Sequence, residues 1–490
     1  MSGDPAFASA RELLARLDRR ELSSRELLDH FVARVERLNA PLNAVVTLDV
    51  EHARARADAA DAARARGESL GPLHGLPVTI KDTWETAGIR STSGAPQYAA
   101  HVPKADAVAV RRLVDAGAIV FGKTNTPMLG GDVQTYNDVF GVTSNAWNPA
   151  HTPGGSSGGA ATAVATGMTS FELGSDIGGS IRTPSNWCGV YGLKTSYGIV
   201  PMRGHIAPAP GTLSQADLCV AGPIARDASD LDLLLDVLAG PLEEEAVGWR
   251  LALPPPRRGS LREYRVAAWL DDAAFPVDAA VSERLQATVS ALRAAGVTVS
   301  EDARPAFALA DCMRDYQRLL YAVIAADYPK EAFEGFVAAA AGADPAATDA
   351  FSRFVLSGTA RHRDWLAARE AALRLRAALR EFFRTFDVLL CPVTPVAAIP
   401  HDNRDPMPAR KIRVNGAARP YDDLFAWISI ATLGFLPAVA APVGLTRDGL
   451  PVGVQIVAPY LEDRTAVDFA RRLGEVIGGF AAPPGYDESH

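Results

Sequence analysis

The sequence is poor in cysteine and lysine, with four cysteines and six lysines among its 490 residues. Cys188, Cys219, Cys312 and Cys391 lie far apart, so their spacing predicts neither a disulfide framework nor a metal site. Histidines and carboxylates show no metal-ligand spacing either, and we expect no metal and no organic cofactor. The simplest interpretation is a cytoplasmic protein with free thiols.

Long apolar runs are also missing. No segment approaches roughly 18 consecutive apolar residues, which argues against a membrane-spanning helix and predicts no membrane partner. The N-terminal segment has no apolar stretch of the kind found in secretory signals. The formal net charge of −8 argues against nucleic acid as a partner. We find no internal repeat at a fixed period.

Short apolar segments alternate with helical patterns in a chain that is 48% hydrophobic and 22% charged. Strands are predicted at 76–80, 118–121, 171–173, 266–270 and 388–393. Helices are predicted after a Ser23–Glu26 capping box, at 52–67, at 230–239 with Ser229 as N-cap, at 281–295, and over most of 306–386. This alternation predicts an α/β fold.

Lys81 follows the first of these apolar segments, in GLPVTIKD (residues 75–82). Burial at the end of a strand disfavours the charged ammonium, so the pKa of Lys81 should fall below its ordinary value. A lysine made neutral in this way can accept a proton. The alternative is a surface lysine whose stem packs on apolar residues while its ammonium stays in water.

Two glycine-serine segments follow, GGSSGG at 154–159 and GSDIGGSIR at 174–182. Four glycines in six positions disfavour a regular element and allow close backbone approach, and the small-residue helix expected next would offer N–H groups to an anion. Two glycines before Ser180 let consecutive N–H groups converge beside a nucleophile. A flexible linker and an ordinary Gly-Gly turn are the respective alternatives.

Two further motifs suggest different chemistry. GAIVFGKT at 117–124 fits the phosphate-loop pattern, but its middle residues are themselves a predicted strand, so we disfavour nucleotide binding. GGSSG also fits the nucleophile elbow of α/β-hydrolases, which would make Ser156 or Ser157 the nucleophile. That interpretation needs a downstream histidine, for which His362 and His401 are candidates, and it leaves an esterase as a remote alternative.

Taken together, the lysine and the two glycine-serine segments resemble the amidase signature family of serine hydrolases. The resemblance is strongest over residues 70–205 and continues more weakly through 432–444 and 449–457. It implies a single α/β domain over 1–490, with a mixed central sheet covered by helices on both faces. We expect a helical part at 1–70, a signature core at 71–205, and a remainder at 206–490 that includes a variable helical region at 306–386.

The resemblance also implies roles for individual residues. Ser180 would be the nucleophile, Ser156 the bridging serine and Lys81 the base, and the peptide bond before Ser156 would be cis. Backbone N–H groups would form the oxyanion hole, those of Ile177, Gly178, Gly179 and Ser180. Hydrogen bonds from Ser157, Asp176 and Arg182 would support the site.

The substrate is less well defined by the sequence. The resemblance places a substrate pocket along Met128, Leu129, Gly130, Phe425, Trp427, Ile428 and Phe435, several of which we expect to pack in the core instead. These side chains favour a small-molecule aryl or alkyl amide, with carbamates and esters as further options. A homodimer is left open.

The alternative within the family is the glutaminase subunit of an amidotransferase that acts on charged tRNA. That branch typically carries glutamine after Ser-Ile-Arg, where this chain has Thr183. It also typically carries an acidic residue in the stretch that is Thr126–Leu129 here. Both differences weaken this alternative.

Overall fold

Two sheets, one large and one small, hold the strands that surround the predicted site. The computed structural model describes residues 4–347 and 349–487. The large sheet contains β6 (Glu172–Asp176), β7 (Tyr191–Lys194), β8 (Val220–Ala225), β9 (Arg265–Ala268), β10 (Thr298–Ser300), β11 (Val388–Pro392), β14 (Ala438–Leu445) and β15 (Pro451–Val457). The small sheet contains β1 (Val45–Leu48), β2 (Pro77–Lys81) and β3 (Ile119–Thr124). Two short hairpins pair β4 (Tyr136–Asn137) with β5 (Gly141–Val142), and β12 (Lys411–Val414) with β13 (Ala417–Pro420).

The helices of the first half of the chain are α1 (Ala10–Asp18), α2 (Ser24–Leu38), α3 (Val50–Ala65), α4 (Val108–Asp115), α5 (Gly158–Ala165), α6 (Arg182–Cys188) and α7 (Ala228–Leu238). Those of the second half are α8 (Ala279–Ala294), α9 (Leu309–Ala326), α10 (Lys330–Gly342), α11 (Ala350–Gly358), α12 (His362–Thr385), α13 (Ala426–Leu433) and α14 (Asp463–Ile477).

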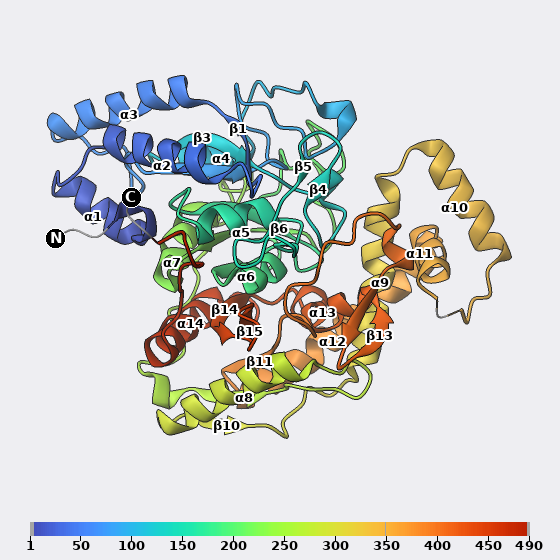
Figure 1. Cartoon of the computed structure of the whole chain (residues 1–490). Helices are drawn as coiled ribbons and strands as arrows, with labels where there is room; N and C mark the ends of the chain where they lie inside the picture. The colour runs from blue at the N-terminus through green and yellow to red at the C-terminus, as the bar shows by residue number, and fades with distance from the viewer. Residues whose placement is uncertain (1–3, 348, 488–490) are drawn as a thin grey trace.

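The large sheet has the strand order β10-β9-β11-β15-β14-β7-β8-β6 and is mixed. The first three strands run parallel, and every later neighbour is antiparallel. Helix α14 contacts both α7 and α8, and these three cover one face, while α6 contacts β7, β14 and β15 from the other. The protein is therefore a single α/β domain with a mixed central sheet flanked by helices, as predicted (Figure 1).

The strand that ends in Lys81 does not belong to the central sheet. In the small sheet, β3 lies between β1 and β2 and runs parallel to β2. β2 also packs against β6, the edge strand of the large sheet that leads into the Ser180 segment. This packing brings two strands that are distant in sequence to one place, where both of them end.

Most helix predictions are confirmed, with small shifts at the ends. α2 begins with the predicted capping box, in which the Ser23 side chain accepts from the Glu26 N–H and the Glu26 carboxylate from the Ser23 N–H. The prediction of Ser229 as the N-cap of α7 is wrong: the cap is Asp227, whose carboxylate accepts from the Ser229 N–H. α5 begins at Gly158, inside the segment expected to be irregular.

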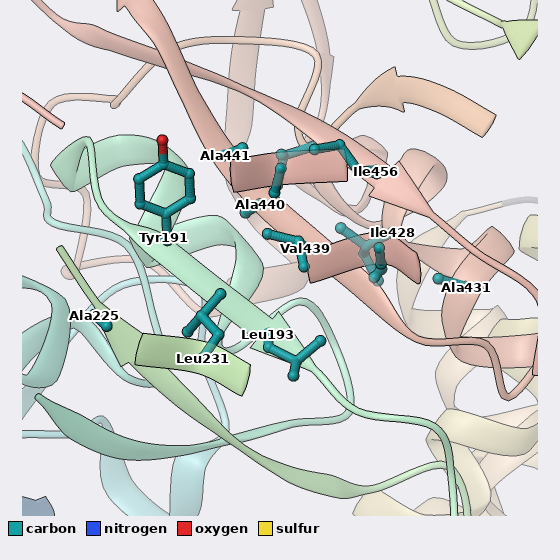
Figure 2. Packing of buried hydrophobic residues seen from close by; sticks show 14 of the residues in the cluster. Tyr191, Leu193, Ala225, Leu231, Ile428, Ala431, Val439, Ala440, Ala441 and Ile456 are labelled. Carbon is teal, nitrogen blue, oxygen red and sulfur yellow. The ribbon is translucent and has the colours of Figure 1, made fainter. Parts of the chain in front are cut away.

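The region predicted to be mainly helical folds into α9, α10, α11 and α12, which Figure 1 shows at one side of the molecule with α10 outermost. α9 packs against α13, and α13 lies over the central sheet. Apolar side chains of β7, β14, α7 and α13 gather between these layers; Figure 2 shows Leu193, Val439, Leu231 and Ile428 among them, all fully buried. This core holds the strand ends in place.

Candidate active site

Lys81 is the last residue of β2 and is fully buried. Its Nζ lies 2.6 Å from Ser156 Oγ and 3.0 Å from Ser175 Oγ. Burial lowers the pKa of Lys81 to about 7, against smaller opposing effects of Cys219, Asp176 and Glu172. The side chain is therefore buried rather than at the surface, and close to half of it is neutral near pH 7.

Ser156 follows a cis peptide bond after Gly155, the bond that the resemblance implied. Glycine is required around it because other backbone segments approach closely. A methyl group added at Gly155 would lie 2.7 Å from the Asp132 carbonyl oxygen, and one at Gly159 would lie 2.4 Å from the Asn125 nitrogen. The glycines thus let this segment pass between neighbouring chain segments and point Ser156 at Lys81.

Ser180 lies in the turn between β6 and α6 and is 6% exposed. Its carbonyl oxygen accepts a hydrogen bond of 3.0 Å from the Ser157 N–H, which ties the two serine segments together. The Gly179 N–H donates to Asp176 Oδ1. Within the described residues, the N–H groups of Ile177, Gly178 and Ser180 have no protein acceptor, so three of the four predicted oxyanion donors are free for a ligand.

Asp176 and Arg182 form a fully buried ion pair that frames this turn. The guanidinium donates to both carboxylate oxygens, at 2.8 and 3.0 Å. Burial alone would raise the pKa of Asp176, but the charge and hydrogen bonds of Arg182 outweigh burial and lower it. The Ile181 N–H also donates to Asp176, so a charged carboxylate holds the backbone on both sides of Ser180.

The predicted supporting residue Ser157 contributes its backbone to this arrangement. Its N–H donates to Ser180, while its buried hydroxyl has no hydrogen-bond partner among the described residues.

The predicted pocket residues separate into two groups. A methyl group at Gly130 would lie 3.4 Å from Ser156 Oγ, and methyl groups at Gly178 and Gly179 would lie 3.3 Å from Phe425 and 3.2 Å from Ile428. Gly130, Phe425 and Ile428 therefore border the two serine segments.

Other members of the predicted pocket lie elsewhere. Trp427 is fully buried against Trp269 in the core, with ring centroids 5.8 Å apart. Phe435 stacks on Tyr197 at 4.1 Å. Met128 is half exposed, and Leu129 has a left-handed backbone with φ of 52°.

Several residues at the site carry no signal in the sequence. Tyr316 of α9 donates to the Ile177 carbonyl at 3.0 Å, and Gln455 of β15 accepts from Arg182 at 2.6 Å. Ser175 contacts Lys81, and His205 Nε2 lies 2.9 Å from Ser175 Oγ. Only Ser175 could have been suspected, because it stands inside the second glycine-serine segment.

The two competing motifs serve other roles. Lys123 of the phosphate-loop pattern lies within β3, fully buried, and donates to Thr86 Oγ1 at 2.8 Å. His362 stacks on Trp365, and His401 Nε2 lies 3.3 Å from the Pro149 carbonyl. In the described part of the chain, neither histidine hydrogen-bonds to Ser156 or Ser157.

Metal ligands and membrane-spanning helices are both missing from the described residues. Within 4–347 and 349–487, no three or more histidine, cysteine, aspartate or glutamate side chains are grouped so as to hold a metal ion. None of the described helices combines the length and apolar character needed to cross a membrane. All four cysteines are free and buried.

Comparison with known proteins identifies the family. The family model described as Amidase matches residues 26–467. The chain belongs to the amidase signature family. The predicted resemblance is thereby confirmed, and the chain is an enzyme of the amide-hydrolysing class that this family comprises.

Relatives of this amidase-family chain cover nearly its whole length. A glutamyl-tRNA(Gln) amidotransferase subunit from Synechococcus sp. (strain CC9605) is 33% identical over 490 residues, which are 95% of each chain. A crystal structure of an amidase is 28% identical, with a TM-score of 0.78 over 96% of this chain and 100% of that one. The 6-aminohexanoate cyclic dimer hydrolase is 25% identical, with a TM-score of 0.80 over 99% and 100%.

Proposed function

We propose that this chain hydrolyses apolar aryl or alkyl amides through an acyl-enzyme on Ser180, with Ser156 as proton relay and Lys81 as base. The observation that carries the proposal is the 2.6 Å contact between a fully buried, partly neutral lysine and Ser156. A neutral amine at this place can accept the Ser156 hydroxyl proton, while Ser156 accepts that of Ser180.

The reaction then proceeds in two halves. Ser180 Oγ attacks the amide carbon, and the oxyanion that forms accepts from the N–H groups of Ile177, Gly178 and Ser180. The proton held by Lys81 returns through Ser156 to the amide nitrogen, and the C–N bond breaks to release the amine. Water attacks the acyl-enzyme with the same proton path, which releases a carboxylic acid and restores Ser180.

An apolar substrate group is supported by the side chains beside the oxyanion turn. Phe425 and Ile428 contact that turn, and neither can bind a charged headgroup. The nearest acidic side chains of that segment are already paired: Asp423 with Arg419, and Asp422 with Tyr321 and Gln317. Burying an aryl or alkyl group against such a wall is worth about 25 cal/mol per Å2.

A second candidate is the glutaminase subunit of an amidotransferase. It is favoured by the 33% identity to the Synechococcus protein over nearly the whole chain. Thr183 and the absence of an acidic residue at 126–129 weigh against it. This candidate requires partner subunits, whereas the first requires only a small-molecule amide.

Two measurements test the proposal. A fluorophosphonate should label Ser180 and leave a Ser180→Ala variant unlabelled; labelling at Ser156 or Ser157 would instead support the nucleophile-elbow alternative. In a substrate panel, aryl or medium-chain amides, carbamates or esters should exceed glutamine and acetamide in kcat/KM by at least about tenfold. Glutamine as the best substrate would favour the amidotransferase candidate and leave the triad standing.

A further inference from the structure

A second polar contact of Lys81 leads away from Ser156 and ends at a histidine. Lys81 Nζ lies 3.0 Å from Ser175 Oγ, and the same oxygen lies 2.9 Å from His205 Nε2. Ser175 is on β6, directly before Asp176, and His205 is in the loop that follows β7. The mechanism above uses neither residue, yet both are connected to its base.

The fold holds His205 in this place through the segment that follows Lys81. His205 forms an isolated β-bridge with Trp84, and its ring meets the edge of the Trp84 indole with centroids 4.7 Å apart. The next residue, Ile206, donates to the Thr83 carbonyl at 2.7 Å. The imidazole is therefore fixed by the same stretch of chain that carries the lysine.

The protonation of His205 follows from its surroundings. Burial, and secondarily the nearby Lys81 charge, lowers the pKa of His205 to about 3, against a hydrogen bond to the Ala207 backbone that raises it. A hydrogen bond that raises the pKa of an imidazole is one that the ring donates. Because a neutral imidazole has one donor and one acceptor nitrogen, donation to Ala207 leaves Nε2 as the acceptor for the Ser175 hydroxyl.

We propose that His205 is a positioning residue that acts through Ser175 to direct the lone pair of Lys81 toward Ser156. The inference rests on the proposed role of Lys81 as base. A serine hydroxyl has one proton, and with that proton given to His205, Ser175 can only accept from Lys81. The amine then spends one N–H on Ser175 and keeps its lone pair for the Ser156 proton.

Without His205, the Ser175 hydroxyl is free to turn and donate to the Lys81 lone pair. That hydrogen bond would occupy the base and stabilise its neutral form. The charged or titratable groups that act on Lys81 are Cys219, Asp176 and Glu172, and none of them is altered when His205 is replaced. A change in the ionisation of Lys81 on replacing His205 would therefore report the Ser175 connection.

The test follows the rate at which a fluorophosphonate inactivates the full-length protein as a function of pH, because this rate needs no knowledge of the substrate. His205→Leu should lower the plateau rate by roughly tenfold to a hundredfold and move the ionisation to lower pH. His205→Gln, whose carbonyl can accept from Ser175, should recover most of the rate. Ser175→Ala should also be slow, and His205→Leu should add little to it.

His74→Leu is the matched control. His74 is a buried histidine whose Nε2 lies 2.9 Å from the Ala60 carbonyl, far from the serine segments in the N-terminal part of the fold. It should lose stability without a change in the ionisation. If His205→Leu and His205→Gln behave alike, or if the losses at His205 and Ser175 add, the positioning role is wrong. If the unchanged protein is not labelled at Ser180, the proposed function itself has failed.

Discussion

The ends of β2 and β3 place two lysines next to each other in adjacent parallel strands, and the two lysines differ in what surrounds them. In the register of the small sheet, Ile80 pairs with Lys123 and Lys81 pairs with Thr124. Both lysines are fully buried, and burial lowers the pKa of Lys81 to about 7 and that of Lys123 to about 8. Burial alone therefore does not distinguish a base from a structural ammonium.

The difference lies in the partners. Lys123 donates to the Trp84 carbonyl and to the hydroxyls of Thr86 and Ser91, and Asp82 raises its pKa against burial. Three acceptors use all three N–H groups of an ammonium, so Lys123 is suited to holding the turn after β2 in its charged form. Lys81 meets two hydroxyls, which can donate as well as accept, and one of them is Ser156.

The largest effect is expected on removing the Lys81 amine. Lys81→Ala should lower kcat for the best amide by at least about a thousandfold, because general-base catalysis is lost. Lys81→Arg should not recover the rate, since a guanidinium stays charged. Steady-state kinetics of the purified variants measure this. Lys104→Ala, at an exposed lysine, is the control and should match the unchanged protein.

The pH dependence separates the two lysines next. With Lys81 as base, the active form is the neutral amine, so kcat should rise about tenfold per pH unit below about 7 and stay level above it. The same profile measured on Lys123→Met should keep its ionisation near 7. An ionisation that disappears with Lys123 would exchange the roles that we give to the two lysines.

Replacing Lys123 should affect stability more than catalysis. Lys123→Met leaves the Trp84 carbonyl and the Thr86 hydroxyl buried without their donor, and should lower the free energy of unfolding by about 1–3 kcal/mol at pH 7. Because the pKa of Lys123 is lower in the folded state than in the unfolded one, the unfolded state binds more protons above about pH 8. Lys123 therefore makes stability rise with pH in that window, and urea titrations should show that Lys123→Met lacks this rise.

The sequence predicted the parts of the site that are local in the chain. The apolar residues before Lys81 indicate burial, and the glycines around Ser156 and Ser180 indicate close backbone approach, because each depends on its immediate neighbours. The geometry of these three segments agrees with what the resemblance implied for the lysine contact and for the cis bond. The assignment of Ser180 as nucleophile remains a prediction.

The parts that the sequence could not provide come from residues brought together by the fold. Tyr316 stands 139 residues after the Ile177 carbonyl that it binds, and Gln455 stands 273 residues after Arg182. The apolar pattern of 425–435 could not separate Phe425, beside the oxyanion turn, from Trp427, inside the core, because adjacent helical residues of similar character point in different directions. Likewise, no local signal shows that β2 and β3 form a sheet of their own.

The smallest effect is expected from removing a single acceptor of Lys123. Thr86→Val keeps the shape of the side chain but removes the hydroxyl that lies 2.8 Å from Nζ, and should lower the free energy of unfolding by about 0.5–1.5 kcal/mol at pH 7. The lost bond stabilises the charged ammonium, so the deficit should shrink as pH rises through about 8, where Lys123 becomes neutral. Thr86→Ser, which retains a hydroxyl, should show neither the deficit nor its pH dependence, and kcat should be unchanged in both. A fall in kcat for Thr86→Val without a loss of stability would mean that the two strand ends are coupled in catalysis, and that Lys123 contributes to the proton path rather than only to the fold around it.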